Sequence, residues 1–217
     1  MLRFLLLFCL LPSGLAAQRT DSSAVNRLQF GLVYGQADHE VDFTPSASVE
    51  PLRGTEYGVA LRYFDNHLVG FQAEVSLVEA GWREELDSTF TTLYERSISY
   101  LEVQLLTQFS IGRGAVQPLI QAGPYLAFPL REEEQIPIEY TPGDFLIPPV
   151  YGFAFPFRPN YGLRVGAGLN LELGPVTFQA EGRVLIGFND LVRTGVTQAA
   201  ISRRTGVGVH TGVFVAL

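Results

Sequence analysis

Hydrophobic and polar residues alternate with a period of two along most of this chain. Between Tyr161 and Leu173 the alternation continues without a break, and it recurs between Thr205 and Leu217. A period of two places successive side chains on opposite faces of a β-strand, so each such segment is predicted to be a strand with one apolar face. Eight segments of this kind follow one another: 28–35, 56–63, 69–77, 101–109, 116–128, 161–173, 176–189 and 204–217.

The lengths of the segments and of their connections favour a membrane-spanning barrel. The predicted strands have about 9–14 residues, whereas soluble strands average about 5–6 and a tilted strand needs about 9–11 to cross a bilayer. Short and long connections alternate, which places turns on one rim and loops on the other, as in outer-membrane barrels. The tight turns are 65–67, 112–114 and 174–175, and the long connections are 36–54, 80–96, 129–160 and 189–203.

The fold class predicted from this pattern is all-β: an eight-stranded antiparallel up-and-down transmembrane β-barrel. In such a barrel the apolar face meets lipid and the polar face lines the lumen. Most strand glycines, such as Gly166 and Gly168, share the polar face, and small residues suit the narrow lumen of an eight-stranded barrel. A soluble secreted barrel, with its apolar face inside, is the alternative.

The first seventeen residues have the three parts of a secretory signal peptide. Arg3 is followed by an apolar run from Phe4 to Leu11, and small residues follow at Ala16 and Ala17. The run is too short to cross about 30 Å of hydrocarbon as a helix. We therefore predict a cleaved signal peptide at 1–17, with Ala16 as an alternative last residue, and a barrel domain at 18–217 in the outer membrane.

Composition excludes several kinds of chemistry. The net charge is −7 and charged residues make up only 17% of the chain, so no basic surface for nucleic acid is expected. All basic side chains other than histidine are arginines, which removes lysine-dependent catalysis. The single cysteine, Cys9, lies in the predicted signal peptide, so we expect no disulfide and no thiolate zinc site. No cofactor and no metal is predicted.

The chain resembles the PorT-like family of small eight-stranded outer-membrane β-barrel proteins. The stretches that carry the resemblance are Tyr100-Leu101-Glu102-Val103, Gln121-Ala122-Gly123-Pro124-Tyr125, Gly166-Ala167-Gly168-Leu169 and Glu181-Gly182-Arg183. The resemblance covers most of the chain after the signal peptide and implies an eight-stranded fold in the outer membrane. The C-terminus departs from the family pattern, because the last residue is Leu217 and the nearest aromatic residue is Phe214.

Ionisable residues on the polar face are predicted to form a charge network inside the barrel. A buried charge without a partner is costly, so these side chains are expected to pair. Counting from the rim suggests that Arg62 lies near Glu74, and that Glu181, Arg183 and His210 share one depth. A network that fixes the barrel is the first interpretation, and a proton or ion path is the second. The predicted members are Glu56, Arg62, Glu74, Glu102, Arg164, Glu172, Glu181, Arg183, Arg204 and His210.

The three histidines give little support for catalysis or metal binding. His39 is predicted in the first long loop beside Asp38, Glu40 and Asp42, where its spacing is unspecific for a divalent cation. His67 falls in a tight turn, and His210 faces the lumen. None has a convincing nucleophile for a serine-histidine-acid site.

The third long connection carries the best candidates for contact with another molecule. Among its prolines are aromatic residues, of which Tyr151, Phe153, Phe155 and Phe157 are predicted as contact residues. Stiff proline-rich backbone and exposed aromatic rings suit recognition. The same segment could instead fold over the mouth as a lid.

The function predicted from these observations is that of a non-enzymatic outer-membrane barrel with structural or surface-binding roles. Its expected partners are outer-membrane lipid and a protein partner at the extracellular loops. One alternative is an accessory component of a secretion or transport machine. Another is a lipid-modifying enzyme with a site on the rim.

Overall fold

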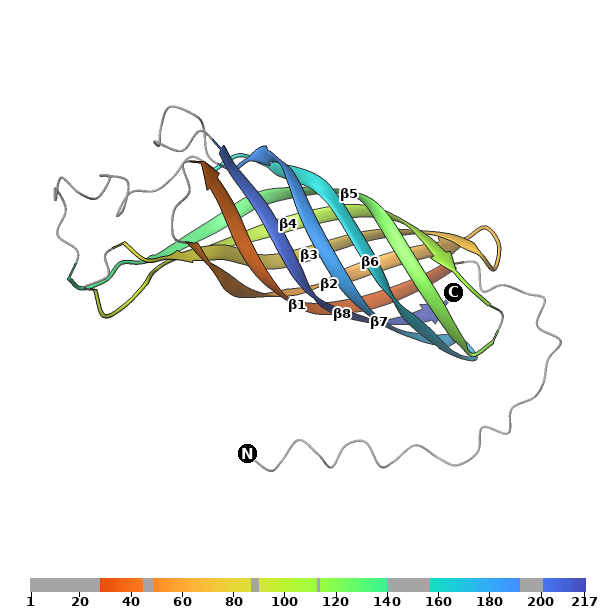
Figure 1. The fold of residues 1–217 in the computed structure, drawn as a ribbon. Helices are drawn as coiled ribbons and strands as arrows, with labels where there is room; N and C mark the ends of the chain where they lie inside the picture. The colour runs from red at the N-terminus through yellow and green to blue at the C-terminus, as the bar shows by residue number, and fades with distance from the viewer. Residues whose placement is uncertain (1–27, 45–48, 87–89, 113, 140–156, 192–200) are drawn as a thin grey trace, which may run out of the picture.

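The computed structural model forms a closed barrel of eight antiparallel strands joined in sequence order (Figure 1). It describes residues 28–44, 49–86, 90–112, 114–139, 157–191 and 201–217. The strands are β1 (Leu28–Thr44), β2 (Val49–Phe64), β3 (Val69–Glu84), β4 (Tyr94–Ser110), β5 (Val116–Gln135), β6 (Asn160–Leu173), β7 (Val176–Asp190) and β8 (Ile201–Ala216). β1 pairs with β8 from Gln29↔Ala216 to Thr44↔Ile201, which closes the barrel.

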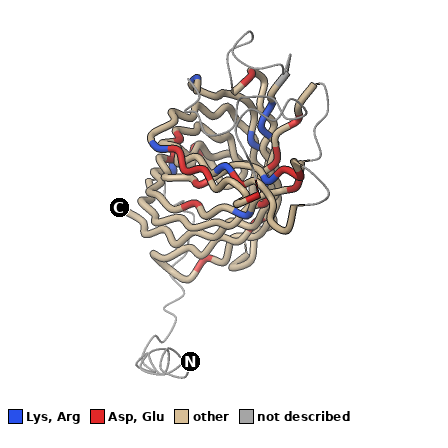
Figure 2. The backbone as a smooth tube through the Cα atoms, turned by 90° about the vertical axis from the view of Figure 1, so that its left-hand side faces the viewer, with Lys and Arg blue, Asp and Glu red and all other residues tan. Residues whose placement is uncertain are grey.

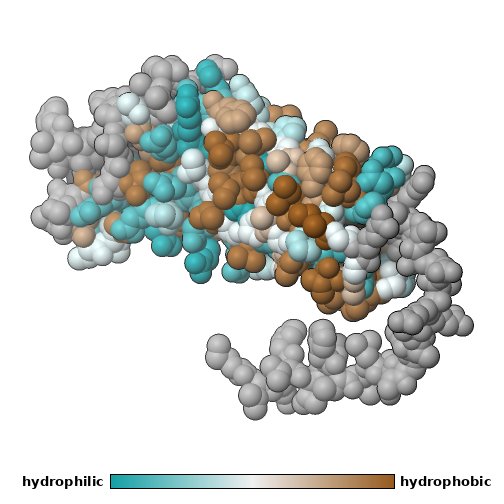
Figure 3. All heavy atoms as spheres, turned by 45° about the vertical axis from the view of Figure 1, so that its right-hand side comes forward, coloured by the Kyte–Doolittle hydropathy of each residue, from teal (hydrophilic) through white to brown (hydrophobic). Residues whose placement is uncertain are grey.

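Side chains point alternately into and out of the barrel, as the period of two predicts. The outward residues of β8 include Val207 and Val209, which are 60% and 64% exposed, whereas the inward Arg204 and His210 are 1% and 3% exposed. Figure 3 shows apolar side chains over the middle of the barrel and polar ones toward the end that carries the longer connections. The apolar outer face and polar lumen are the arrangement of a membrane barrel and exclude the soluble alternative.

The strands have 14 to 20 residues and are therefore longer than the sequence predicted. They extend into all four of the connections that were expected to be long loops, leaving 45–48, 85–93, 136–159 and 191–200 between strands. The prediction failed there because it required apolar residues on the outer face. Above the apolar part of the outer face, outward positions such as Asp38 and Glu79 are polar while the backbone pairing continues.

The strands are staggered as well as tilted. Following hydrogen-bonded neighbours from Tyr34 through β2, β3 and β4 leads to Phe128 on β5, whereas the path through β8, β7 and β6 leads to Pro118. The two ends of the circuit are ten residues apart on one strand, which is the shear of the barrel. This stagger decides which inward side chains meet across the lumen.

The three short turns lie at the end of the barrel where the C-terminus lies (Figure 1). In the first turn, the side-chain oxygen of Asn66 accepts hydrogen bonds from the backbone amides of Leu68 and Val69. Gly112 and Gly174, which begin or form the other two turns, have positive φ angles of 101° and 65°. Glycine is the residue that adopts such angles without strain, which explains its place in these turns. Among the described residues there is no helix that could cross a membrane.

Candidate functional site: the charged lumen and the extracellular mouth

The middle of the lumen is occupied by polar side chains that are almost completely buried. Nine of the ten residues predicted for the charge network are buried, and Glu172, near the short turns, is half-buried. When the barrel is viewed from the end with the longer connections, charged positions gather on one side and across the middle of the barrel (Figure 2). The buried members are Glu56, Arg62, Glu74, Glu102, Arg164, Glu181, Arg183, Arg204 and His210.

Arg164 on β6 is the bridge between two glutamates on the far side of the lumen. Its guanidinium nitrogens lie 2.7 Å from Glu56 on β2 and 2.5 Å from Glu102 on β4. Glu102 also lies 3.2 Å from Arg204 on β8. All four side chains are at most 6% exposed. Such pairs are strong in the low dielectric of a closed lumen, so they tie four strands together across the barrel.

Arg183 on β7 forms the second centre of the network. It lies 3.1 Å from Glu74 on β3 and 2.8 Å from Glu181 on its own strand. His210 on β8 lies between the same two carboxylates, at 3.4 Å from each. The structure therefore brings together Glu181, Arg183 and His210, whose common depth the sequence suggested.

Arg62 does not pair with Glu74, contrary to the expectation from the sequence. The two are not register neighbours, since Arg62 lies opposite Gln72 and Glu74 lies opposite Ala60. The guanidinium group of Arg62 instead donates hydrogen bonds to side-chain oxygens, and it stacks 3.7 Å from the centre of the Phe214 ring. The acceptors are Gln29, Gln108, Asn170 and Gln179, at 3.0 to 3.4 Å.

Glu172 also stands apart from the network. Among the residues that the structure describes, it forms no ion pair within 4 Å, and its side chain lies toward the end with the short turns. The sequence therefore placed the ten predicted residues on the inner face and suggested the group of Glu181, Arg183 and His210, but it gave Arg62 the wrong partner. It also missed the amides that satisfy Arg62, although their positions on the polar face were the available signal.

His39 lies inside the barrel rather than in a loop. It belongs to β1 and is 2% exposed, whereas Asp38, Glu40 and Asp42 alternate with it on the outer face. Residues on opposite faces of a strand cannot share a metal ion. The sequence misplaced His39 because β1 continues beyond the apolar segment.

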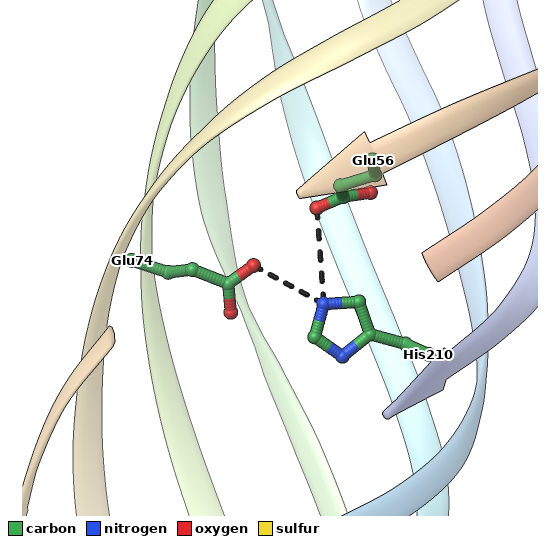
Figure 4. A group of neighbouring side chains, drawn as sticks. All are labelled: Glu56, Glu74 and His210. Carbon is green, nitrogen blue, oxygen red and sulfur yellow. Dashed lines mark ion pairs between the residues drawn. The ribbon is translucent and has the colours of Figure 1, made fainter. Parts of the chain in front are cut away.

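Three other groups lie close enough together to hold a metal ion. Single ligand atoms of Glu56, Glu74 and His210 lie within 4.8 Å of one another (Figure 4). However, the nearest oxygen of Glu74 already accepts hydrogen bonds from Gln104 at 2.7 Å and from Arg183 at 3.2 Å. Donors that occupy the carboxylate oxygens compete directly with a cation, so the site fits ion pairing better than metal binding.

The lumen becomes apolar toward the extracellular mouth. Tyr100, Tyr125, Leu185 and Trp82 belong to one buried cluster, against which Phe157 from the third long connection packs. Tyr151, Phe153 and Phe155 lie outside the described residues. Phe157 therefore packs against the apolar layer of the lumen, which agrees with the lid interpretation for that residue.

An ion-pair cluster lies above this apolar layer. Arg96 is fully buried and lies 2.5 Å from both Glu132 and Glu134, which were expected in a loop but belong to β5. Beyond the strands, the hydroxyl group of Thr91 donates a hydrogen bond to Glu139. This bond lowers the pKa of the Glu139 carboxyl group, because it stabilises the charged form.

The outer wall near the mouth carries a polar depression with a volume of about 190 Å³. Its lining includes Arg53, Glu79, Glu95, Ser97 and Glu133 from four neighbouring strands. Two ion pairs neutralise part of its charge, Arg83 with Glu95 and Arg131 with Glu133. The depression adds a hydrated, concave surface to the extracellular end.

The sequence matches a model of a known protein family. Residues 17–193 match a family model described as "Outer membrane protein beta-barrel domain". The chain belongs to this family. The barrel therefore lies in the outer membrane, and its apolar outer face is in contact with lipid.

Solved structures of other outer-membrane barrels are similar in fold. OprG from Pseudomonas aeruginosa has a TM-score of 0.51 and 13% identity, and the match covers 87% of this chain and 95% of that protein. Neisserial surface protein A has a TM-score of 0.49 and 14% identity, and the match covers 87% of this chain and 97% of that protein. AlkL in lipid bilayers has a TM-score of 0.48 and 12% identity, and the match covers 91% of this chain and 95% of that protein. No curated protein matches this sequence.

Proposed function

We propose that this outer-membrane barrel is a non-enzymatic, closed scaffold that presents its extracellular end for binding. The observation that supports this function is the ion-pair network across the lumen, in which Arg164 and Arg183 bridge carboxylates from opposite walls. The cavity beside the network has a volume of only about 20 Å³. A single water molecule needs at least about 10–15 Å³ by this measure, so this cavity admits about one water molecule and no larger solute.

Conductance across a planar bilayer tests whether the barrel is closed. We expect the purified protein, inserted as a folded barrel, to give no steady conductance steps at neutral pH, because bound side chains obstruct the lumen. Folding is verified by heat-modifiable migration on a gel, and intact mass verifies removal of residues 1–17, which we propose as the signal peptide. Reproducible ohmic steps from the folded protein would refute a closed scaffold.

The extracellular loops are the proposed binding surface. Replacing Tyr151, Phe153, Phe155 and Phe157 together with serine is expected to reduce capture of a cross-linked protein partner from native outer membranes at least tenfold. The reason is that aromatic side chains supply much of the contact energy in interfaces. Unchanged capture by a correctly folded variant would reject loop recognition.

A matched variant separates recognition from the covering of the mouth. Phe157 contacts the buried apolar cluster, so the variant Phe157→Ser alone should affect mainly the stability of the mouth. Capture that falls only when Tyr151, Phe153 and Phe155 are also replaced assigns the loss to recognition.

We also propose that the chain is related to PorT-like proteins. Its loops could then bind as an accessory component of a secretion or transport machine. Cross-linking that captures a large membrane complex would favour this role. A lipid-modifying enzyme is less well supported, because among the described residues no histidine is hydrogen-bonded to a serine. Altered membrane lipid after deletion of the protein would favour the enzyme.

A further inference from the structure

His210 occupies the centre of the charged lumen. It lies on β8, directly opposite Gly35 on β1 and Glu181 on β7. A Cβ atom at Gly35 would lie 3.0 Å from the imidazole ring, so the glycine leaves the space in which the ring lies. The side chain is 3% exposed, which removes bulk water as its partner.

Both ring nitrogens of His210 face carboxylate oxygens. Nε2 lies 3.4 Å from Oε1 of Glu74 and 3.9 Å from Oε1 of Glu56 (Figure 4). Nδ1 lies 3.4 Å from Oε1 of Glu181. A neutral imidazole has one nitrogen with a free electron pair. In either tautomer the nitrogen that carries this electron pair lies 3.4 Å from a carboxylate oxygen, which is electrostatically repulsive. Neither nitrogen has hydrogen-bond geometry toward its carboxylate, so the contacts are ion pairs, and the imidazolium form makes both of them attractive.

The charge count of the lumen agrees with the geometry. Arg62 and Glu172 form no ion pair within 4 Å in the described part of the chain, so they are left out of the count. The ion-paired residues of the lumen network are four glutamates, three arginines and His210, namely Glu56, Glu74, Glu102, Glu181, Arg164, Arg183, Arg204 and His210. The ionised side chains other than His210 therefore leave one negative charge uncompensated. Uncompensated charge is costly in a closed lumen of low dielectric. A positive charge on His210 brings the sum to zero.

We infer that His210 is a proton-binding site that locks the lumen: its second ring proton joins β8 to carboxylates on β2, β3 and β7. The charged groups that face it are Glu56 from β2, Glu74 from β3, and Glu181 and Arg183 from β7. When this proton leaves, the imidazole becomes neutral and no longer compensates the carboxylates that face it. The ties between β8 and the opposite wall then weaken.

A small cavity gives a proton access to this site. The cavity of about 20 Å³ is lined by His39, Arg164 and His210 and by glycine backbone of β1 and β8. It has room for a water molecule, and Nδ1 of His39 and Nε of Arg164 have no hydrogen-bond partner within the protein. Water in this cavity would connect His210 with His39, which lies nearer the extracellular mouth.

The protonation state of His210 can be observed directly. Histidine labelled with ¹⁵N in the refolded protein should give three sets of signals, from His39, His67 and His210, and the variant His210→Gln assigns the last set. We expect both nitrogens of His210 to carry protons at about pH 7, with slow exchange against solvent. The exposed His67 provides an internal reference for fast exchange with solvent. A neutral tautomer of His210 at about pH 7 would overturn the inference.

The same spectra test the competing metal site. Addition of zinc ions should leave the His210 signals unchanged, because two protons occupy the ring nitrogens. Loss of one proton with a shifted nitrogen signal on adding zinc would replace the proton lock with a metal site.

A pH series tests whether the proton stabilises the barrel. Without the proposed signal peptide the chain contains no lysine and no cysteine, so histidine is the side-chain type whose charge ordinarily changes between about pH 6 and pH 9. As the pH rises, the stabilisation from His210 is lost, so the rate of unfolding in urea should increase at least tenfold. The variant His210→Gln should unfold rapidly at both ends of this pH range, and its unfolding rate should change little between them.

Restoring the charge balance provides the decisive control. In the double variant Glu74→Gln with His210→Gln, one negative charge and the histidine are removed together, so slow and pH-independent unfolding should return. A pH dependence that persists in His210→Gln would show that another group carries it. If the double variant is no slower than His210→Gln, the charge count is wrong and the inference fails.

Discussion

Replacing Arg164 with alanine is expected to lower the free energy of unfolding by about 3–5 kcal/mol. Arg164 is 4% exposed and neutralises both Glu56 and Glu102. Without it, two buried carboxylates face each other across the lumen with less compensation. The single tryptophan, Trp82, is buried in the apolar cluster above the network. Its fluorescence during urea titration of the protein in micelles measures the loss.

The exposed ion pair between Arg53 and Asp38 provides a matched control. These side chains are 72% and 44% exposed, and the two groups lie 3.0 Å apart. Because solvent screens such a pair, Arg53→Ala should leave the free energy of unfolding almost unchanged. Similar losses in the two variants would show that the lumen network does not hold the barrel.

A second test distinguishes the contribution of a charge pair from the cost of breaking it. The double variant Arg164→Ala with Glu102→Gln removes a cation and one of its anions, so it should be more stable than Arg164→Ala alone. Buried ion pairs are weak evidence for net stability, because desolvation offsets the attraction. Their larger effect here is to specify which strands face each other.

Replacing Phe214 with alanine is expected to cost about 3–5 kcal/mol. The ring is fully buried at the end of the lumen with the short turns and lies against the guanidinium group of Arg62. It also fills the space beside Gly31 and Gly212, where an added Cβ atom would lie 2.4 Å and 2.6 Å from the ring. Alanine would leave a cavity and remove the stacking partner of a buried cation. Urea titration measures the loss.

Two further variants check the reason for this loss. Val213→Ala changes the neighbouring outward residue, which is 44% exposed to lipid, and should cost only about 1 kcal/mol. Gly31→Leu combined with Phe214→Ala places a new side chain in the cavity from the paired position on β1. This combination should recover part of the stability. A double variant no better than Phe214→Ala would argue against cavity formation as the cause.

The orientation of Phe214 differs from that of its neighbours at the end of β8. The structure shows that it points into the lumen, whereas Val213, Val215 and Leu217 are on the outer face. Phe214 therefore packs the interior and does not extend the aromatic residues of the lipid-facing surface.

Sequence reasoning was most accurate where one local rule sufficed. The alternation around Leu163 and Phe178 placed their neighbours Arg164 and Gln179 correctly in the lumen. It failed at strand ends, as with His39 and Glu132, because there the outer face is polar and the hydrophobic pattern disappears while hydrogen bonding continues. Arg96 was missed as a buried cation for the same reason.

The sequence by itself determined the number of strands, their order and the face on which each regular strand residue lies. These properties follow from a period of two and from turn residues, which act over short distances. Only the tertiary structure decided that Arg164 meets Glu56 and Glu102, that Arg183 rather than Arg62 meets Glu74, and that His210 lies between two carboxylates. Contacts across the lumen depend on the tilt and ten-residue stagger of the closed barrel, and no local pattern in the chain encodes that geometry.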